Sequence, residues 1–202
     1  MQGTIRQQKC WWMGSLCVAC LLVAGMVGYW TIYRYLYPYG RKEGAVSLPG
    51  LYLSLLAYAG DHGGWFPYSD KGPYDALQKL YDSYCPSGKE LAGVSGDSKA
   101  VATALRGGKS LDASVSSWVY IQGLRLGDPE RLALVWESRP GLYWNGRRNS
   151  SGARAVLLIN GDITNVAAAD WIGFLMWQEQ MRAEVLRSRQ MEETNQVSSE
   201  QN

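Results

Sequence analysis

The feature that most constrains this chain is an uncharged apolar run near its N-terminus. Residues 10–30, CWWMGSLCVACLLVAGMVGYW, are 21 residues without Asp, Glu, Lys or Arg. A helix needs about 20 such residues to cross a hydrocarbon core, so the run is long enough to span a bilayer. Amphipathic rings settle at the headgroup level, and aromatic residues flank the run at both ends, namely Trp11, Trp12, Trp30 and Tyr33. We therefore predict one transmembrane helix over residues 10–33.

Two other interpretations of this run stay open. A cleaved signal peptide would have a shorter apolar region ending in small residues, whereas here apolarity continues past Ala24 to a bulky aromatic end. A lipoprotein signal would place its cysteine at the end of the run, and LCVAC at residues 16–20 matches such a box only in part. A spanning helix is favoured over both. Charge does not decide its orientation, because basic residues flank both sides: Arg6, Lys9, Arg34, Arg41 and Lys42.

Composition narrows what the rest of the chain can do. With 20 basic and 18 acidic residues the net charge is +2, so nothing global indicates a nucleic-acid partner. One histidine in 202 residues argues against a His-based triad or a multi-His zinc site, and we expect no cofactor. Cys85 is the one cysteine outside the apolar run, so it has no disulfide partner in the domain. We expect it to pack in the core, with a free thiol or an intermolecular bridge as alternatives.

Hydrophobic spacing predicts that an α+β domain follows the apolar helix. A flank of residues 1–9 precedes the helix, and Pro and Gly make residues 34–50 a connector. Within a domain at residues 51–189, periodicity predicts short helices at 51–59, 73–84 and 97–107, and a last helix at 168–189. Alternating and apolar runs predict antiparallel strands at 115–121, 132–136, 153–159 and 162–166, with Asn160 and Gly161 in a type I′ turn. Residues 190–202 are expected to be a disordered tail.

Four segments of the domain, in the same order, carry a resemblance to a known family. They are LYLSLLAYAGDHGGWFP, ALQKLYDSYCPSG, WVYIQGLRLGDPERLALVWE and NSSGARAVLLINGDITNV, within residues 48–166. They resemble pseudopilin-like proteins of the type II secretion, prepilin type (H-X9-DG), which are abundant in Planctomycetes and Verrucomicrobia. The resemblance implies a pseudopilin-like domain on an N-terminal anchor in the inner (cytoplasmic) membrane of a bacterium. It also implies that this C-terminal domain lies outside the cytoplasm.

The chain departs from that family at its motif and at its anchor. The family's first His falls on Ser150, its Asp-Gly on Asn160 and Gly161, and its second His on Asp162. Chemistry that used those His and Asp side chains is therefore not expected, whereas Asn-Gly still suits a turn. Prepilins begin with Gly-Phe-Thr-Leu-x-Glu, and GSLCVA at residues 14–19 has Ala19 in place of that Glu. We expect a permanent anchor rather than a processed, filament-forming pilin.

Two groups of residues are candidate sites. Asp61 and His62, with Asp70 nearby, are weak metal candidates, because the spacing lacks the carboxylate density of a calcium loop. Between Glu137 and Asp162 there is no acidic residue, and the candidate binding residues there are Arg139, Trp144, Arg147, Arg148 and Arg154. Such a patch can hold phosphate backbones, anionic glycan or lipid headgroups. A solvated loop whose aromatic residues cover the sheet is the favoured interpretation.

These observations favour a single-pass, membrane-anchored, non-enzymatic protein. It would act through protein contacts in or beside a secretion or envelope assembly, with the lipid bilayer and other envelope proteins as partners and with self-association left open. The alternative is an envelope binding module that uses residues 136–154 for an anionic glycan or nucleic acid. An enzyme ranks third, because no nucleophile, acid–base pair or metal set is visible in the sequence.

Overall fold

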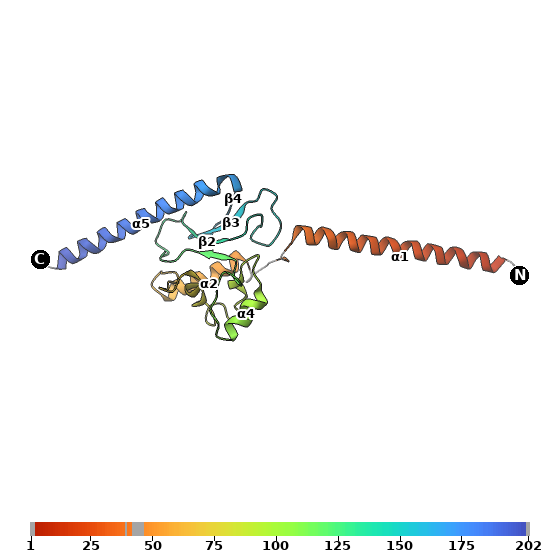
Figure 1. Cartoon of the computed structure of the whole chain (residues 1–202), viewed down its shortest axis with the longest axis horizontal. Helices are drawn as coiled ribbons and strands as arrows, with labels where there is room; N and C mark the ends of the chain where they lie inside the picture. Colours follow the sequence, from red (N-terminus) through yellow and green to blue (C-terminus); the bar gives the residue numbers. More distant parts are fainter. Residues whose placement is uncertain (1–2, 39, 42–46, 201–202) are drawn as a thin grey trace.

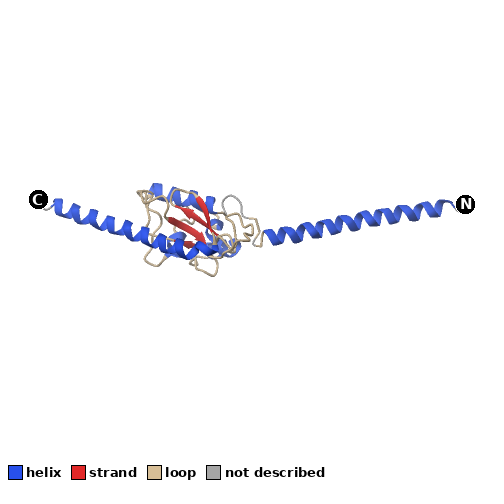
Figure 2. Ribbon diagram, turned by 90° about the horizontal axis from the view of Figure 1, so that it is seen from above, coloured by secondary structure: helices blue, strands red, loops and turns tan. Residues whose placement is uncertain are grey.

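The computed structural model describes residues 3–38, 40–41 and 47–200, with side chains from residue 18 onward except at 193 and 195–200. A long helix, α1 (Gly3–Leu36), leads into a mixed domain that ends in a second long helix, α5 (Trp171–Glu200). The free ends of α1 and α5 extend from the domain in opposite directions (Figures 1 and 2). The chain is therefore a globular α+β unit carried between two projecting helices.

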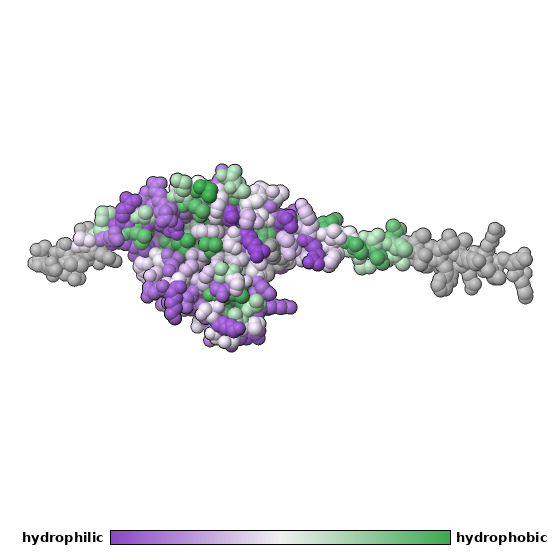
Figure 3. Space-filling view, viewed as in Figure 1, coloured by the Kyte–Doolittle hydropathy of each residue, from purple (hydrophilic) through white to green (hydrophobic). Residues whose placement is uncertain are grey.

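The helix α1 lies apart from the domain and exposes its apolar side chains. Its segment Val18–Leu36 is long and apolar enough to cross a membrane, and none of it is buried within the protein. Leu21 and Met26 are 73% and 65% exposed, and Figure 3 shows a hydrophobic surface along this part of the helix. Lipid can cover such a surface where water cannot do so favourably. Of the expected aromatic ends, Trp30 and Tyr33 lie near the domain, whereas the Trp11 and Trp12 side chains fall outside the described residues.

A four-stranded antiparallel sheet forms the centre of the domain. Its strand order is β1-β2-β3-β4, so each strand pairs with its neighbours in sequence. Every residue of β2 is buried, as expected of a central strand. One face carries the shorter helices and α5 lies across the other (Figures 1 and 2). The elements are α2 (Leu48–Asp61), α3 (Pro73–Gln78), η2 (Lys89–Ala92), α4 (Ser98–Arg106), β1 (Trp118–Tyr120), β2 (Ala133–Glu137), β3 (Arg154–Leu158), β4 (Ile163–Val166) and η3 (Ala168–Asp170).

A β-bulge in β2 puts Ala133 and Trp136 on the same face of the sheet. The pairing of β2 with β3 shifts between Ala133 and Val135, which makes Leu134 an extra residue on its strand. In a regular strand, Ala133 and Trp136 would point to opposite faces, because side chains alternate. With the bulge, both pack with Val156 in the smaller core beneath α5. The larger core lies on the other face, beneath α2, α3 and α4.

Two helix boundaries differ from the sequence prediction, and a third helix agrees with it. The helix expected from residue 51 begins at Leu48, because Pro49 lies in the first turn, where proline is tolerated. The helix expected over 73–84 ends at Gln78, and a left-handed residue, Asp82 with φ 74°, interrupts any continuation. The third helix is confirmed: Asp97 accepts from the N–H groups of Lys99 and Ala100 at its start.

The strand expected over 115–121 is shorter in the structure, where β1 covers Trp118–Tyr120. Before Trp118 the chain bonds partly to η2: Ser117 N–H donates to the Ala92 carbonyl (2.7 Å) and the Ser116 hydroxyl donates to the Leu91 carbonyl (2.6 Å). The Ser117 carbonyl still accepts from Ser138 N–H (2.9 Å). Regular pairing begins only at Trp118. As the alternating pattern predicted, Trp118 and Tyr120 are buried on one face, while Val119 on the other face is half-buried against the smaller core.

The last helix is longer than its sequence pattern indicated. It was expected over 168–189 with a disordered tail at 190–202, whereas α5 continues to Glu200 and crosses that expected domain boundary. Residues 190–200 contain no Gly or Pro and include Gln, Met and Glu, all good helix formers. This end of α5 projects beyond the domain, on the side away from α1 (Figure 1).

The hairpin between β3 and β4 forms as predicted, but with a different turn. Leu158 N–H donates to the Asp162 carbonyl and Gly161 N–H donates to the Leu158 carbonyl, which closes a three-residue loop. Gly161 has φ 90°, whereas Asn160 is not in the positive-φ region that a type I′ turn requires at both positions. Tyr52 of α2 packs over this turn and donates its hydroxyl to the Ile159 carbonyl (3.1 Å). Contact with α2 thus accompanies the change of turn.

Gly161→Ala is expected to destabilise the domain by about 2–4 kcal/mol. A Cβ there would lie 2.5 Å from Tyr52 Cε1, in addition to the strain of φ 90°. Gly63→Ala is the matched control, because Gly63 has φ 62° with no atom within 4 Å of a Cβ, and it should cost only about 1–2 kcal/mol. Urea unfolding of the full chain in mild detergent, followed by tryptophan fluorescence, measures both. Equal losses would show that the Tyr52 contact has no effect.

Cys85 is expected to be unreactive in the folded chain. It is 1% exposed in the larger core, and burial raises the pKa of its thiol to about 11. At pH 8 only about one molecule in a thousand carries the reactive thiolate. In a chain with Cys10, Cys17 and Cys20 replaced by alanine, maleimide labelling should therefore be at least about 100-fold slower than in guanidinium. Rapid labelling of the folded chain would instead place Cys85 at an accessible surface.

Candidate functional site

A groove of about 560 Å³ lies where the end of α1 meets the domain. We call it the junction groove, and it is formed between α1 and the loop of residues 139–152 that joins β2 to β3. None of the described residues that line it is acidic. The lining residues are Tyr35, Pro38, Arg139, Pro140, Gly141, Leu142, Arg148, Asn149, Ser150 and Gly152. Two arginines and several hydrogen-bonding groups thus converge on one hollow.

Arg148 joins this loop to α1. Its Nε donates to the Tyr35 carbonyl (3.0 Å), its backbone N–H donates to the Leu36 carbonyl, and its guanidinium lies 5.1 Å from the centre of the Tyr35 ring. The last carbonyls of a helix have no partner within the helix and carry partial negative charge. A cationic donor at this position satisfies them. Arg148 therefore fixes the groove against the last turn of α1.

The loop itself is ordered by its own backbone hydrogen bonds. Gly141 N–H donates to the Ala153 carbonyl, Asn149 N–H donates to the Gly141 carbonyl, and Tyr143 N–H donates to the Arg147 carbonyl. Leu142, 3% exposed, fixes the loop in the larger core. The groove is consequently part of the folded domain and is formed before any ligand arrives.

Glu137, at the end of β2, connects the groove loop to the segment after η2. Its side chain is fully buried, and its carboxylate accepts from five donors. The N–H and hydroxyl of Ser95 donate at 3.2 and 2.6 Å, and the Ser117 hydroxyl donates at 2.8 Å. The remaining donors are the N–H groups of Val94 (2.8 Å) and Arg139 (3.3 Å). Spacing in the sequence does not reveal this role, although an acid that ends a buried strand must find such partners.

The structure divides the predicted binding residues between three places. Arg139 and Arg148 line the junction groove, and Arg147 is exposed beside it on the same loop. Trp144 packs against the larger core, as the favoured interpretation expected. Arg154 lies on the opposite face of the sheet, 4.4 Å from the centre of the Trp171 ring, where burial lowers the pKa of its guanidinium.

The degenerate family motif is also divided. Ser150 lines the junction groove, whereas Asn160, Gly161 and Asp162 form the turn beyond the other end of β3. A five-residue strand separates the two parts by roughly 15 Å. The Asn160 side chain donates to Asp162 Oδ2 (2.7 Å) and accepts from Asp162 N–H (3.0 Å), so it stabilises the turn. The motif positions do not meet in one site here.

The weak metal candidates take part in local packing contacts. His62 stacks on Tyr58 with ring centres 3.7 Å apart, and its Nδ1 lies 2.8 Å from the Tyr58 carbonyl, which can only accept. Tyr84 donates its hydroxyl to Asp61 Oδ2 (2.9 Å), and this bond raises the pKa of Tyr84. In the part of the chain that the structure describes, no three metal-ligating side chains gather.

A buried ion pair that the sequence did not reveal holds α5 to the domain. Arg189 donates through Nη2 to the Asp128 carboxylate and through Nη1 to the Gly123 carbonyl (2.9 Å). Its guanidinium also lies 4.7 Å from the centre of the Trp65 ring. The Arg189 and Asp128 side chains are 14% and 3% exposed, so the pair is largely out of water. The basic residue expected at the end of the helix instead fixes its middle.

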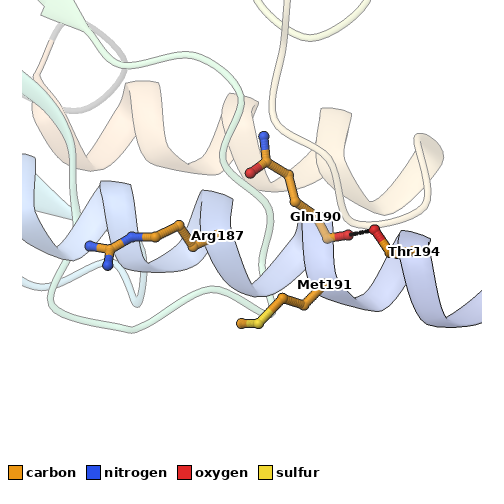
Figure 4. A pocket seen from close by; sticks show the side chains of 4 residues that line it. All are labelled: Arg187, Gln190, Met191 and Thr194. Atoms are coloured by element: carbon orange, nitrogen blue, oxygen red, sulfur yellow. Dashed lines mark hydrogen bonds between the residues drawn. The ribbon is translucent and has the colours of Figure 1, made fainter.

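A second hollow, of about 590 Å³, lies along the outer half of α5 (Figure 4). Its described lining residues are Arg187, Gln190, Met191 and Thr194, all from the same helix. Thr194 donates its hydroxyl to the Gln190 carbonyl (2.8 Å) within that helix. No second element closes this hollow among the residues described, so it is a helix surface rather than a built pocket.

Compared with models of protein families, with curated proteins and with solved structures, the chain matches none.

Proposed function

We propose that this chain is a single-pass membrane protein that presents a non-enzymatic, pseudopilin-like domain beside the bilayer. The observation that carries the proposal is the fully unburied apolar window of α1, with a domain attached to its last turn through Arg148. Such a helix needs lipid around it, and such a junction keeps the domain at the membrane surface. The inner membrane, and a position of the domain outside the cytoplasm, belong to the same proposal.

The domain acts through protein contacts in or beside a secretion or envelope assembly. The support for this part is the surface of α5, which exposes apolar side chains although its other face covers the sheet. Ile172 and Met176 lie one turn apart and are 66% and 69% exposed, and Trp177 beside them is 40% exposed. Exposed apolar side chains that cluster in this way are typical of interaction surfaces.

The arrangement gives less support to an extended polyanion as ligand. A glycan or nucleic acid needs a continuous basic stripe. Arg154 stacks on Trp171 across the sheet, and Trp144 packs into the core, so neither extends the surface that Arg147 and Arg148 present. The basic residues that remain together are those at the junction groove.

Alkaline carbonate extraction of cell membranes tests the anchor. The full chain should stay in the membrane pellet, whereas Val23→Arg with Val27→Arg should release it, because each arginine at a helix centre costs about 2.5–3.5 kcal/mol of insertion free energy. Leu53→Arg with Leu186→Arg is the matched control, since these residues are 66% and 56% exposed on the domain. Release of the unmodified chain by carbonate would contradict the proposal.

Photo-crosslinking in the native host tests the protein contacts. A photoreactive residue at Ile172 or Met176 should give a discrete heavier species, and one at the exposed Glu130 should not. Absence of any adduct at both α5 positions would contradict a role through this surface.

A further inference from the structure

We propose that the junction groove binds the phosphate of an anionic phospholipid in the same bilayer that α1 spans. This inference rests on the proposed membrane anchor and adds a ligand class and a site to it. The groove is lined by Arg139 and Arg148, has no acidic residue among its described lining residues, and has a volume of about 560 Å³. An arginine fork can hold a phosphate through two parallel hydrogen bonds.

The groove lies at the depth of the lipid headgroups. The expected transmembrane span, residues 10–33, ends just before the groove, which begins with Tyr35 and Pro38. Each headgroup layer is roughly 5–7 Å thick, which a helix crosses in about four residues. Residues 35–38 therefore lie in the headgroup layer when residues 10–33 cross the hydrocarbon core.

The aromatic residues of α1 support the same depth. The rings of Tyr29 and Tyr33 stack with their centres 6.3 Å apart, and the ring centres of Tyr33 and Tyr37 are 5.2 Å apart. The guanidinium of Arg34 lies 5.0 Å from the centre of the Trp30 ring. Aromatic rings with basic side chains beside them are typical of the membrane–water interface. The mouth of the groove is thus next to this aromatic belt rather than out in solution.

Charge favours an anionic headgroup over a zwitterionic one. The loop contains Arg139, Arg147 and Arg148, and no acidic residue lies between Glu137 and Asp162 in the sequence. Glu137 itself is fully buried. Each basic residue near an anionic membrane surface raises the protein's partition coefficient onto that membrane about fivefold. Arg148 donates its Nε–H to the Tyr35 carbonyl, whereas its two Nη groups have no hydrogen-bond partner in the described part of the chain. The groove therefore offers a fixed guanidinium at headgroup height.

Hydrogen exchange of the full chain in lipid nanodiscs tests this site. Amides of residues 141–150 should exchange at least about threefold more slowly in phosphatidylglycerol discs than in phosphatidylcholine discs of the same acyl chains. The ratio is taken relative to residues 125–131, which lie at the other end of β2, so a general effect of surface charge cancels. Equal ratios in the two lipids would overturn the proposal.

Variants separate the groove from a general basic surface. Arg148→Gln and Arg139→Gln should each abolish the lipid-dependent difference, and Arg131→Gln, which removes the same charge at the far end of β2, should keep it. Arg148 also fixes the end of α1, and Arg139 has an interaction of its own. Each variant is therefore compared between the two lipids, because a loosened junction speeds exchange in both lipids alike and cannot imitate loss of the site. A difference that survives both groove variants would overturn the site.

Two further results distinguish this proposal from its alternatives. Inorganic phosphate added to phosphatidylcholine discs should give no protection, and equal protection would assign the groove to a soluble anion instead. A chain that does not co-purify with discs would contradict the anchor itself. A chain that co-purifies without lipid-dependent protection would contradict only the lipid site.

Discussion

Glu137→Ala is expected to lower the free energy of unfolding by about 3–5 kcal/mol, which is a large part of the stability of a domain this size. The substitution removes a fully buried carboxylate that accepts from five donors. Those donors lie in three segments, around Val94, Ser117 and Arg139, which meet at this carboxylate. Without the carboxylate, several N–H and O–H groups stay buried with no acceptor.

Urea unfolding of the full chain in mild detergent, with tryptophan fluorescence, measures this loss. Glu130→Ala is the matched control. Glu130 is an exposed glutamate in the loop before β2, so its loss should change the free energy of unfolding by less than about 0.5 kcal/mol. Glu137→Gln keeps the shape but turns an NH2 group toward the donors, so it should also destabilise. If Glu137→Ala unfolds at the same urea concentration as the unmodified chain, the buried network does not hold the domain together.

Asp128→Ala is expected to cost about 3–5 kcal/mol, because it leaves the Arg189 charge largely buried without its partner. Arg189 is 14% exposed and also donates to the Gly123 carbonyl, so it cannot simply turn into water. The part of α5 around Arg189 should loosen first, since another polar link of α5 to this region, from Gln178 to Arg131 and Ala133, lies about three turns away. Faster hydrogen exchange near Arg189 would accompany the lower stability.

Glu179→Ala is the control for Asp128→Ala on the same helix. Glu179 pairs with Arg182, but its side chain is 75% exposed, so the loss should be less than about 1 kcal/mol. In a double-mutant cycle, Asp128→Ala should cost much less when Arg189→Met is already present. Additive losses in that cycle would show that the ion pair is not the source of the effect.

Local signals in the sequence predicted much of the secondary structure. The apolar run, the caps Asp97 and Gly107, the central strand and the β3–β4 hairpin each depend on neighbouring residues. The turn type of that hairpin was predicted wrongly, and Tyr52 of α2, which packs over Gly161, is a neighbour that the local sequence does not show. The bulge at Leu134 was missed because both faces of the strand are apolar, so the alternation does not show a shift of register.

The candidate site could be predicted only in part. The absence of acids in residues 138–161 marked the right loop, and Arg139 and Arg148 do line one groove. The contacts that build the groove join residues far apart in the chain: Ser95 and Glu137 are 42 positions apart, and Arg148 and Tyr35 are 113 apart. Spacing rules cannot find such pairs. Arg154 was grouped with the patch although strand alternation places it on the α5 face.

The most direct test of the central claim, a permanent anchor with the domain outside the cytoplasm, combines topology with mass. The chain, carrying a C-terminal reporter, is treated with protease from outside the inner membrane, and an untreated sample is weighed intact. We predict that the domain is digested and that the untreated chain retains the anchor at full mass. A mass loss that corresponds to cleavage after Gly14 would indicate prepilin processing, and full protection of the domain would place it in the cytoplasm. Either result would contradict the claim.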